Sequence, residues 1–381
     1  MPKVALRKVT AYDEAVIRKE LIKAIDDLGG LGKFISPGDK VMLKLNLLMK
    51  KKPEEATTTH PTFVEALVNI LHDFGAVVLL ADSPGGPFNP GRLKGIYDAG
   101  GYQDVSDRTG AILNYDVSES KRECEPAKFL KTQTVMHALD TVDHVISVSK
   151  LKTHGMMKFT GAVKNQFGIV PGVLKAEYHF TMPKTEDFAD ALIDICMCAN
   201  PVLSFMDGIV GMEGDGPSAG TPVDIGAVIV SESPYHLDVV ATQIIGIDPM
   251  SVPTIEQSVK RQLIRSDFSD IVLVGERVES LKMDSFEVPE IRNVGFLEAV
   301  PNWLRKPVDH LLKTKPIFDH DTCIGCGECA SSCPPKVIEM KDRLPYVHLE
   351  GCIRCFCCQE LCPAKAVDIH RSWLMKRLLK L

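Results

Sequence analysis

Two closely spaced sets of cysteines near the C-terminus constrain the fold of this 381-residue chain more than any other feature. Each set has the spacing C-x2-C-x2-C-x3-C and is followed directly by a proline. Such spacing wraps a short loop around an iron–sulfur cubane and passes the last thiolate to a second cubane. The sequence therefore predicts two [4Fe–4S] clusters. The sets are Cys323, Cys326, Cys329 and Cys333, then Cys352, Cys355, Cys358 and Cys362.

Crossed ligation divides these eight thiolates between two clusters, each taking three from one set and the fourth from the other. Structural zinc sites usually join two ligand pairs across a longer stretch, so the spacing favours iron. We expect the first cluster on Cys323, Cys326, Cys329 and Cys362, and the second cluster on Cys352, Cys355, Cys358 and Cys333.

The remaining cysteines lie outside both ligand sets. Free cysteine is readily buried, so we expect Cys357, Cys124, Cys196 and Cys198 to be packing residues or free thiols. A disulfide framework is not expected, because residues 1–20 are charged and lack the apolar run of a secretion signal. The sequence therefore indicates a cytoplasmic protein.

Length and composition limit the classes that remain. A chain of this length suggests two or three domains, and its 45% hydrophobic content is ordinary for a globular protein. The formal net charge of −6 gives no reason to expect nucleic acid, and no apolar stretch approaches the roughly 20 residues of a membrane span. The basic, amphipathic tail at 371–381 suits a docked terminal helix better than contact with a membrane surface.

Short β-rich runs alternate with amphipathic helical patterns before the cysteines. This alternation predicts an α/β fold with a mostly parallel sheet and helices on both faces. A small α+β domain around the clusters should follow, so we expect boundaries at 1–300, a linker at 301–316, the cluster domain at 317–370 and the tail at 371–381. Strands are expected at 4–9, 40–45, 76–81, 144–149, 202–206, 225–231 and 271–275, and helices at 13–28, 61–74, 186–199 and 234–246.

Polar side chains follow four of these expected strands. In parallel sheets, ligands bind outside the carboxyl ends of the strands, so a site is expected there. A single polar, glycine-rich loop is often just an exposed turn, but four such loops together favour a site. They contain Lys44 with Asn46, Asp82 to Gly86, Lys150 to His154, and Asp207 to Asp215.

The third loop carries an unusual charge pattern. No carboxylate lies between Asp143 and Glu177, although the whole chain is acidic. Ammonium groups beside glycines suit a carboxylate or phosphate, so a small anionic ligand is expected. The alternative is a solvated basic face or a dock for an acidic partner. No Walker A loop and no G-x-G-x-x-G follows a strand. The five lysines of this stretch are Lys150, Lys152, Lys158, Lys164 and Lys175.

Roles can be assigned to these residues as hypotheses. His154 is the first candidate for proton transfer, and Lys164 is a second candidate catalytic residue. Binding of the substrate is expected from Lys150, Lys152, Asp82, Asp207 and Asp215. His60 and His179 are further acid–base candidates, although single histidines are more often structural. The carboxylates Asp207, Glu213 and Asp215 do not match the EF-hand pattern of a calcium site.

With these residues in view, the chain resembles the uncharacterised domain family numbered 362 over roughly residues 1–300, followed by a bacterial two-cluster ferredoxin module. The resemblance implies low-potential one-electron transfer by the module and no particular substrate. The first part is also distantly similar to the lactate racemase superfamily, whose members use a lysine-tethered nickel pincer nucleotide. The motifs of the resemblance are 44–46, 59–61, 81–85, 150–154, 160–165 with Gly168, and 212–217.

Three functions compete at this point. The first is an iron–sulfur oxidoreductase that relays electrons between a redox partner protein and a small anionic substrate or cofactor in the α/β domain. The second is a non-catalytic electron carrier or adapter that docks a separate reductase through the basic loop. The third is a racemase-like isomerase with structural clusters. An enzyme needs a concave site with convergent polar groups, whereas an adapter needs an exposed patch.

Overall fold

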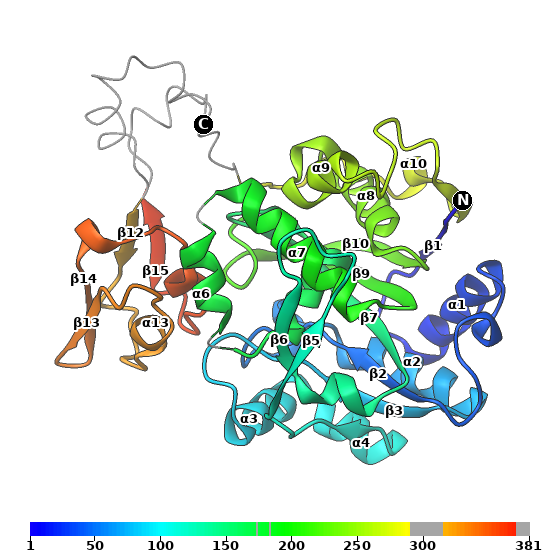
Figure 1. The fold of residues 1–381 in the computed structure, drawn as a ribbon, viewed down its shortest axis with the longest axis horizontal. Helices are drawn as coiled ribbons and strands as arrows, with labels where there is room; N and C mark the ends of the chain where they lie inside the picture. The colour runs from blue at the N-terminus through cyan, green and yellow to red at the C-terminus, as the bar shows by residue number, and fades with distance from the viewer. Residues whose placement is uncertain (173, 183, 290–314, 371–381) are drawn as a thin grey trace.

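The computed structural model describes residues 1–172, 174–182, 184–289 and 315–370, and a twisted sheet forms its centre (Figure 1). Within these residues, the strands run in the order β11-β1-β10-β9-β7-β2-β3-β4, with β8 beside β7. All neighbours are parallel except β1–β10, β10–β9 and β7–β8. The strands are β1 (Lys3–Lys8), β2 (Lys40–Lys44), β3 (Val77–Ala81), β4 (Ile112–Leu113), β7 (His144–His154), β8 (Lys158–Thr160), β9 (Leu203–Glu213), β10 (Thr221–Ser231) and β11 (Val272–Gly275).

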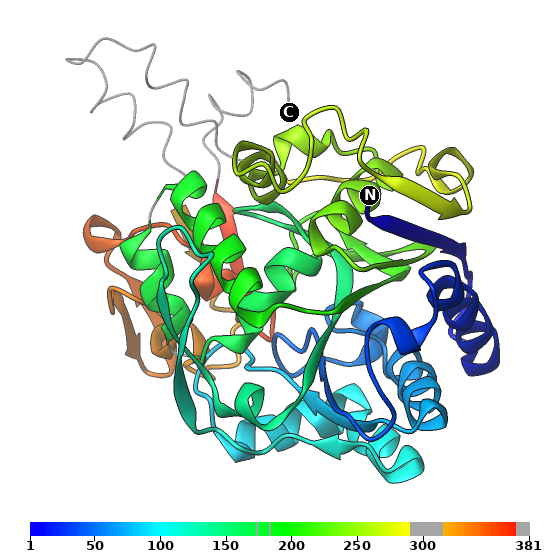
Figure 2. The same cartoon turned by 45° about the vertical axis from the view of Figure 1, so that its right-hand side comes forward.

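Helices cover both faces of this sheet, which confirms the expected fold class (Figure 2). On β2, Val41 and Leu43 face one helical layer while Met42 faces the other, as the alternation of side chains along a strand requires. The first layer contains α1 (Glu14–Asp27), α2 (Pro61–Phe74), α3 (Pro90–Gly100) and α4 (Tyr102–Thr109). The second contains α7 (Thr185–Ala199), α8 (Pro234–Ile244), α9 (Pro253–Lys260) and α10 (Val278–Leu281).

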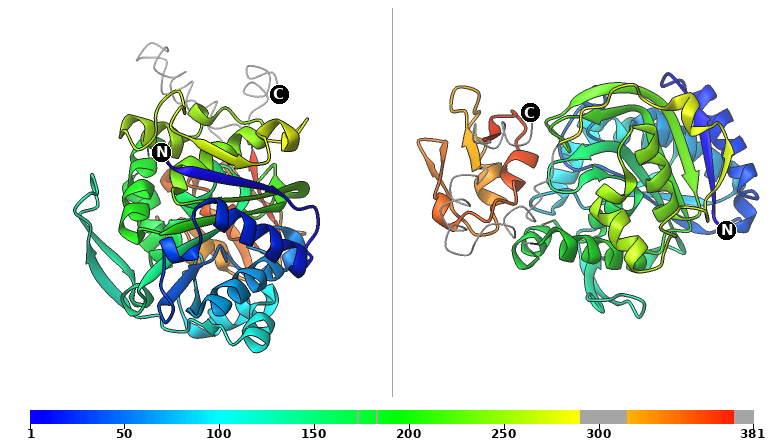
Figure 3. Two further views of the ribbon diagram at one scale, coloured as in Figure 1. Left: turned by 90° about the vertical axis from the view of Figure 1, so that its right-hand side faces the viewer. Right: turned by 90° about the horizontal axis from the view of Figure 1, so that it is seen from above.

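Local signals explain where the helices start and stop. Asp13 caps α1 by accepting a hydrogen bond from the Val16 N–H at 3.0 Å. Pro61 opens α2, and Gly75 ends it with a left-handed φ of 94°. A hairpin of β5 (Glu119–Glu123) and β6 (Thr132–Met136) stands away from the main sheet (Figure 3).

Two strands extend further at their carboxyl ends than the sequence pattern predicts. The residues Lys150 to His154 were expected as a loop, but they continue β7, and Asp207 to Glu213 likewise continue β9. The two strands stay paired across this polar segment, with Lys150 opposite Asp207 and a shift of register just beyond. Charged side chains that neutralise one another across a strand pair allow a strand to continue where hydrophobic periodicity ends.

A separate lobe, here called the cysteine-rich lobe, comprises residues 315–370 and lies beside the α/β part, residues 1–289 (Figure 3). The expected linker falls almost wholly outside the described residues, and the expected tail falls entirely outside them. No helix in the described ranges is long and apolar enough to cross a membrane. The lobe contains β12 (Lys315–Phe318) paired with β15 (Val367–His370), β13 (Ile338–Lys341) paired with β14 (Leu344–Val347), α13 (Glu328–Ser331) and α14 (Cys357–Glu360).

Burial along α1 yields a first prediction for the free energy of unfolding. Leu21 is fully buried in the core, whereas its neighbour Ile22 is 40% exposed. Leu21→Ala should therefore destabilise the protein by about 2–5 kcal/mol, because it leaves a cavity in a packed interior. Ile22→Ala, the matched control, should change stability by less than about 1 kcal/mol. Urea unfolding followed by circular dichroism would measure both, and equal losses would contradict the assigned packing of this helix.

Candidate redox site between the sheet and the cysteine-rich lobe

The cysteines of the two motifs gather around two small cavities in the lobe. In each, the wall combines cysteines from both motifs, as crossed ligation requires. The assignment of the ligands themselves stays a prediction. One cavity is lined by Cys323, Cys326, Cys329 and Cys362, and the other by Cys333, Cys352, Cys355, Cys357 and Cys358.

The two loops share an unusual backbone geometry. In the first, Gly325 and Gly327 flank Cys326 with left-handed φ values of 67° and 76°. In the second, Arg354 and Phe356 flank Cys355 in the same way, with φ values of 56° and 60°. Non-glycine residues rarely adopt this conformation, so its recurrence indicates that each loop must turn its thiols toward one centre.

The surroundings of the thiols suit four-iron clusters. The Ala366 N–H lies 3.2 Å from Cys362 Sγ, and the Gly325 N–H lies 3.4 Å from Cys323 Sγ. Such donors stabilise the negative charge of cluster sulfurs. Among the described residues, no group of His, Cys, Asp or Glu is spaced to hold a single metal ion. A cubane binds each thiolate through a different iron, which spaces the thiols more widely than one ion does.

A larger cavity of about 500 Å³ lies between the α/β part and the lobe, and we call it the interlobe cavity. The ends of β2 and β3, the short helix α5 (Ala162–Asn165) and helix α6 (Leu174–Thr181) form its inner wall, while the lobe closes it. Its polar lining includes Lys44, Asn46, Asp82, Lys164, Asn165, Lys175, Glu177 and His179 from the α/β part, with Cys333, Lys336, Cys357 and Glu360 from the lobe.

Specific contacts hold the lobe against the sheet. Arg92 pairs with Glu328 at 2.7 Å on one side of the interface. On another, Ser218 Oγ donates to the backbone oxygen of Glu360 at 2.6 Å. Leu361 packs so closely on Gly85 that a Cβ there would collide with the leucine side chain at 2.5 Å. The interlobe cavity therefore lies within an interface that specific contacts hold together.

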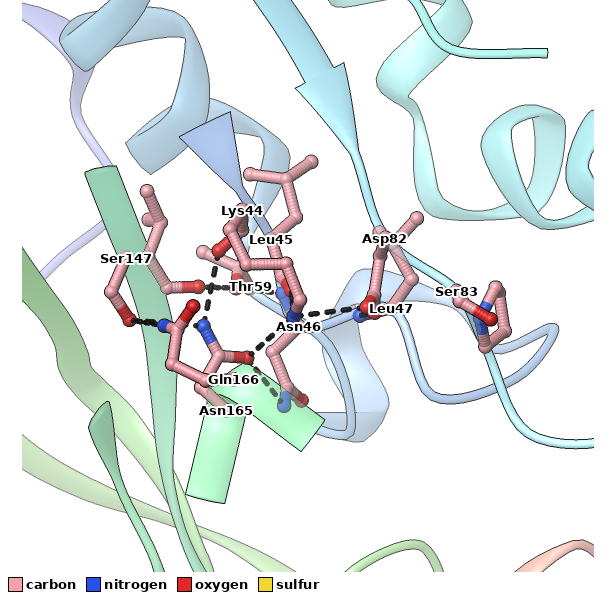
Figure 4. Close-up of polar contacts among 12 residues, drawn as sticks. Lys44, Leu45, Asn46, Leu47, Thr59, Asp82, Ser83, Ser147, Asn165 and Gln166 are labelled. Carbon is pink, nitrogen blue, oxygen red and sulfur yellow. Dashed lines mark hydrogen bonds and ion pairs between the residues drawn. The ribbon is translucent and has the colours of Figure 1, made fainter. Parts of the chain in front are cut away.

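A buried polar network forms the floor of the cavity (Figure 4). Lys44 Nζ lies 2.9 Å from Asp82 Oδ1 and donates to the Leu45 oxygen at 2.6 Å. Asn165 Oδ1 accepts from Lys44 Nζ at 3.3 Å and from Asn46 Nδ2 at 3.2 Å. Burial lowers the pKa of Lys44, and Asp82 opposes that shift. The network fixes Asn165 and hence the position of its chain neighbour Lys164.

Close packing at Gly168 completes this floor. A Cβ at this position would overlap both Asp82 Oδ1 and Lys44 Nζ. Only glycine lets the chain between α5 and α6 lie directly on the ion pair. Close packing thus requires glycine at this position of the family-like motif.

Lys164 and Lys175 are the lysines of the basic stretch that line the cavity. Within the described ranges, Lys164 Nζ has no hydrogen-bond or ion-pair partner, and it lies 5.9 Å from the centroid of the Phe167 ring. Burial lowers its pKa, opposed by the charge of Glu360. Lys175 Nζ donates to the backbone oxygen of Ser83, a neutral acceptor.

Lys150, Lys152 and Asp207, expected to bind substrate, do not line the cavity and lie buried in the sheet. Lys150 Nζ is 2.8 Å from Asp207 Oδ2 and donates to Tyr12 Oη at 2.7 Å. Lys152 Nζ donates to Asn46 Oδ1 at 2.7 Å. Buried amino groups need such partners. Each lysine directs two hydrogen bonds to other protein groups: Lys150 to Tyr12 and Asp207, and Lys152 to Asn46 and the Thr57 backbone oxygen.

The predicted proton donor His154 also lies behind the cavity wall. Its Nδ1 accepts hydrogen bonds from the backbone N–H groups of Met156 and Met157, at 3.1 and 3.2 Å. Its Nε2 lies 3.2 Å from Glu360 Oε1, without hydrogen-bond alignment. Burial, together with nearby lysines, holds the pKa of His154 well below its usual range. His154 Nε2 therefore lies close to the Glu360 carboxylate from behind the cavity wall, without a hydrogen bond to it.

The other candidates from the sequence also divide into residues that line the cavity and residues that do not. Asp82 lines the cavity through its pair with Lys44, whereas Asp215 is exposed and away from it. His179 lines the cavity, but burial lowers its pKa to about 3. His60 stacks on Tyr12 with ring centroids 3.5 Å apart and caps α2, which is a structural role.

Glu360 is the site residue that sequence reasoning missed altogether. It lies between Cys358 and Cys362, where the metal-ligand spacing dominates the pattern. Its side chain reaches the α/β part, and burial raises its pKa despite the nearby cations. No local signal in the sequence distinguishes it from an ordinary surface glutamate.

Crossed cluster ligation makes a specific prediction for Cys333. Cys333 lines the cavity that holds Cys352, Cys355 and Cys358, so Cys333→Ala should damage the second cluster more than the first. Electron paramagnetic resonance of the reduced, anaerobic protein would detect loss of one of two interacting signals, with iron analysis in parallel. Cys357→Ser, whose thiol lines the same cavity outside the predicted ligand set, is the control and should keep both signals. Damage confined to the first cluster would refute the crossing.

Burial of charge predicts a large loss of stability when Lys150 is replaced and a small one when Lys164 is replaced. Lys150→Met leaves Asp207 buried without its cation and should cost about 3–5 kcal/mol of unfolding free energy. Lys164→Met removes an unpaired, partly desolvated ammonium group and should cost less than about 1 kcal/mol. Thermal or urea unfolding would measure both. A Lys164 variant as unstable as the Lys150 variant would show that Lys164 is also a structural cation.

Comparison with known proteins gives matches in both parts of the chain. A family model described as domain of unknown function (DUF362) matches residues 41–243, and a model described as a 4Fe-4S dicluster domain matches residues 315–363. The chain is 29% identical over 289 residues to a thylakoid-associated protein of Synechocystis sp. (strain PCC 6803), covering 76% of this chain and 88% of that protein.

Solved structures give weaker likenesses. The lactate racemase apoprotein from Thermoanaerobacterium thermosaccharolyticum matches with a TM-score of 0.40 and 13% identity, over 61% of this chain and 55% of that chain. A protein from Thermotoga maritima matches with a TM-score of 0.34 and 15% identity, over 57% of this chain and 55% of that chain. The chain thus spans just over half of each of these two structures.

Proposed function

We propose that this chain, which belongs to the DUF362 family and carries a 4Fe-4S dicluster domain, is an iron–sulfur oxidoreductase. Electrons pass between a partner protein and a small anionic ligand in the interlobe cavity. When bound, the clusters supply low-potential one-electron transfer. The observation that carries the proposal is that Lys164 and Cys333, a predicted ligand of the second cluster, line one cavity.

The cavity wall favours an anionic ligand with an apolar body. Lys164 and Lys175 present ammonium groups that carry no carboxylate partner among the described residues. Phe167, Leu48 and Leu361 supply apolar surface around them. A pocket that combines apolar walls with a few fixed polar groups is typical of small-molecule and cofactor sites. Ammonium groups beside backbone turns suit a carboxylate or a phosphate.

The lobe has exposed residues that suit binding of the partner protein away from the interlobe cavity. Cys326, a predicted ligand of the first cluster, is exposed, and its neighbour Ile324 is 59% exposed. Neither residue lines the interlobe cavity. In this arrangement the partner protein meets the first cluster, and the ligand lies next to the second. The two clusters then connect them.

The residues of the chain have distinct tasks in this proposal. Lys164 binds the anion, and the network of Lys44, Asn46 and Asn165 holds Lys164 in place. The contact of Leu361 with Gly85 packs the lobe against the α/β part at the cavity wall. Partial exclusion of water strengthens the electrostatic contacts of the groups that it buries.

A non-catalytic electron carrier or adapter is the second candidate. The exposed end of the first cluster would serve a carrier equally well, but a carrier needs no ligand between the lobes. A racemase-like isomerase is the third, and for it the shared wall with Cys333 would be without purpose. The three candidates therefore differ in whether an anion is bound and whether it senses the second cluster.

Identification of the bound molecule tests the proposal. Protein purified without oxygen should release a small anionic compound detectable by mass spectrometry. The double variant Lys164→Met/Lys175→Met should lose it by at least about tenfold, since the two lysines of the α/β part that line the cavity without a carboxylate partner are gone. Lys184→Met, which removes an exposed lysine away from the cavity, is the control and should retain it. Full retention by the double variant, or no anion in the parent protein with both clusters intact, would favour the carrier.

A further inference from the structure

The lysines of the interlobe cavity differ in what holds their ammonium groups. Lys44 is paired with a carboxylate, at 2.9 Å from Asp82. Lys175 Nζ is bonded to neutral oxygens: the Ser83 backbone oxygen, Ser83 Oγ at 3.3 Å and the Pro84 oxygen at 3.4 Å. A carboxylate partner keeps a proton on a buried lysine, whereas neutral acceptors leave it free to dissociate when water is removed. Lys175 thus lacks the carboxylate partner that favours the protonated form of Lys44.

Two features of the position of Lys175 matter for its proton: access to solvent and a place in the same cavity as Cys333. The side chain stands on the cavity wall with intermediate exposure, so solvent protons can reach it through the cavity. Across the same cavity lies Cys333, a predicted ligand of the second cluster. One added electron makes a cluster more negative by one charge, and a nearby negative charge favours the protonated form of an amine.

Burial and the surrounding charges place the pKa of Lys175 near neutrality. Burial lowers the pKa of Lys175 to about 7, with help from the cations Lys44 and Lys164 and against the attraction of Asp82. The charged and titratable groups that line the same cavity come from the ends of β2 and β3, from α5, from its own helix α6 and from the lobe. They are Lys44, Asp82, Lys164, Glu177, His179, Lys336 and Glu360, together with the thiols of Cys333 and Cys357.

We propose that Lys175 is the proton carrier of the interlobe cavity, taking up one proton from solvent for each electron that is stored at the second cluster. The electron comes from a low-potential one-electron donor by way of the first cluster. The Lys175 amine gains a proton and becomes an ammonium group. When the electron moves on to a ligand, Lys175 returns that proton to the ligand and becomes an amine again.

Each cycle therefore delivers one electron and one proton, and a two-electron reduction takes two cycles. The delivery step rests on the proposed function, because it needs a ligand in the cavity. The uptake of the proton does not. It can be measured in protein that has been freed of any ligand.

The test is the midpoint potential of the second cluster as a function of pH, followed by anaerobic redox titration with electron paramagnetic resonance. The signal of the second cluster is the one that Cys355→Ala removes. In the parent protein the potential should be constant in acid and fall above neutrality by up to ~59 mV per pH unit, the value for one proton per electron. The fall should end where Lys175 stays unprotonated even in the reduced protein.

Two variants of Lys175 distinguish the effect of its proton on the potential from the effect of its charge. Lys175→Arg keeps a permanent charge, so its potential should be independent of pH and equal to the acid value of the parent. Lys175→Met carries no charge, so its potential should be independent of pH and lower. Lys336→Met removes an exposed cation from the lobe side of the same cavity and should keep the slope of the parent.

Iron content and circular dichroism would show that each variant is folded and loaded. A slope that persists in both Lys175 variants, or a parent protein without a slope, would overturn the proposal. A slope that depends on Lys175 in a protein that binds no anion would leave the proton carrier standing and remove the proposed oxidoreductase function. The two proposals therefore fail separately.

Discussion

The buried ion pair between Lys44 and Asp82 is the interaction on which the rest of the site depends. It joins the carboxyl ends of the neighbouring strands β2 and β3, and Asp82 also binds the Leu47 N–H at 2.8 Å. A buried pair is tolerated when its remaining hydrogen-bonding capacity is used, and Asn165 and the Leu45 carbonyl use that of the lysine. Gly168 lies directly on the pair. The course of the chain through α5 and α6, and with it the position of the cavity, follows from this contact.

Because Lys44 and Asp82 neutralise each other, the net charge of the cavity comes from other groups. Lys164 and Lys175 come from the two helices that the ion pair positions, and Glu360 comes from the lobe. Docking of the lobe through Arg92 and Glu328 removes water from these groups. The same interface brings Cys333 to the cavity. The docked lobe therefore accounts both for the desolvation of the cations and for their proximity to Cys333.

Periodicity and spacing predicted much of this molecule, because they record local requirements. The strand at 40–45 and the helix at 61–74 follow apolar patterns that the structure realises as β2 and α2. The cysteine spacing indicated a dicluster domain, which the family comparison supports. The extension of β7 through Lys150 was not predictable, because its stability comes from Asp207 on another strand. Glu360 was not predictable either, since its role arises only when the lobe docks.

The acid-free stretch from 143 to 177 illustrates the same limit in terms of charge. Its lysines suggested one basic face, but their counter-charges lie far away in the sequence. Asp207 is 57 residues beyond Lys150, and Glu360 belongs to the other lobe. Folding therefore separates these lysines by the partners that they meet. Lys150 pairs with the remote carboxylate of Asp207, and Lys152 binds neutral oxygens, so both become part of the sheet. Lys164 and Lys175 remain on the cavity wall without a carboxylate partner, and there an incoming anion or electron supplies the missing negative charge.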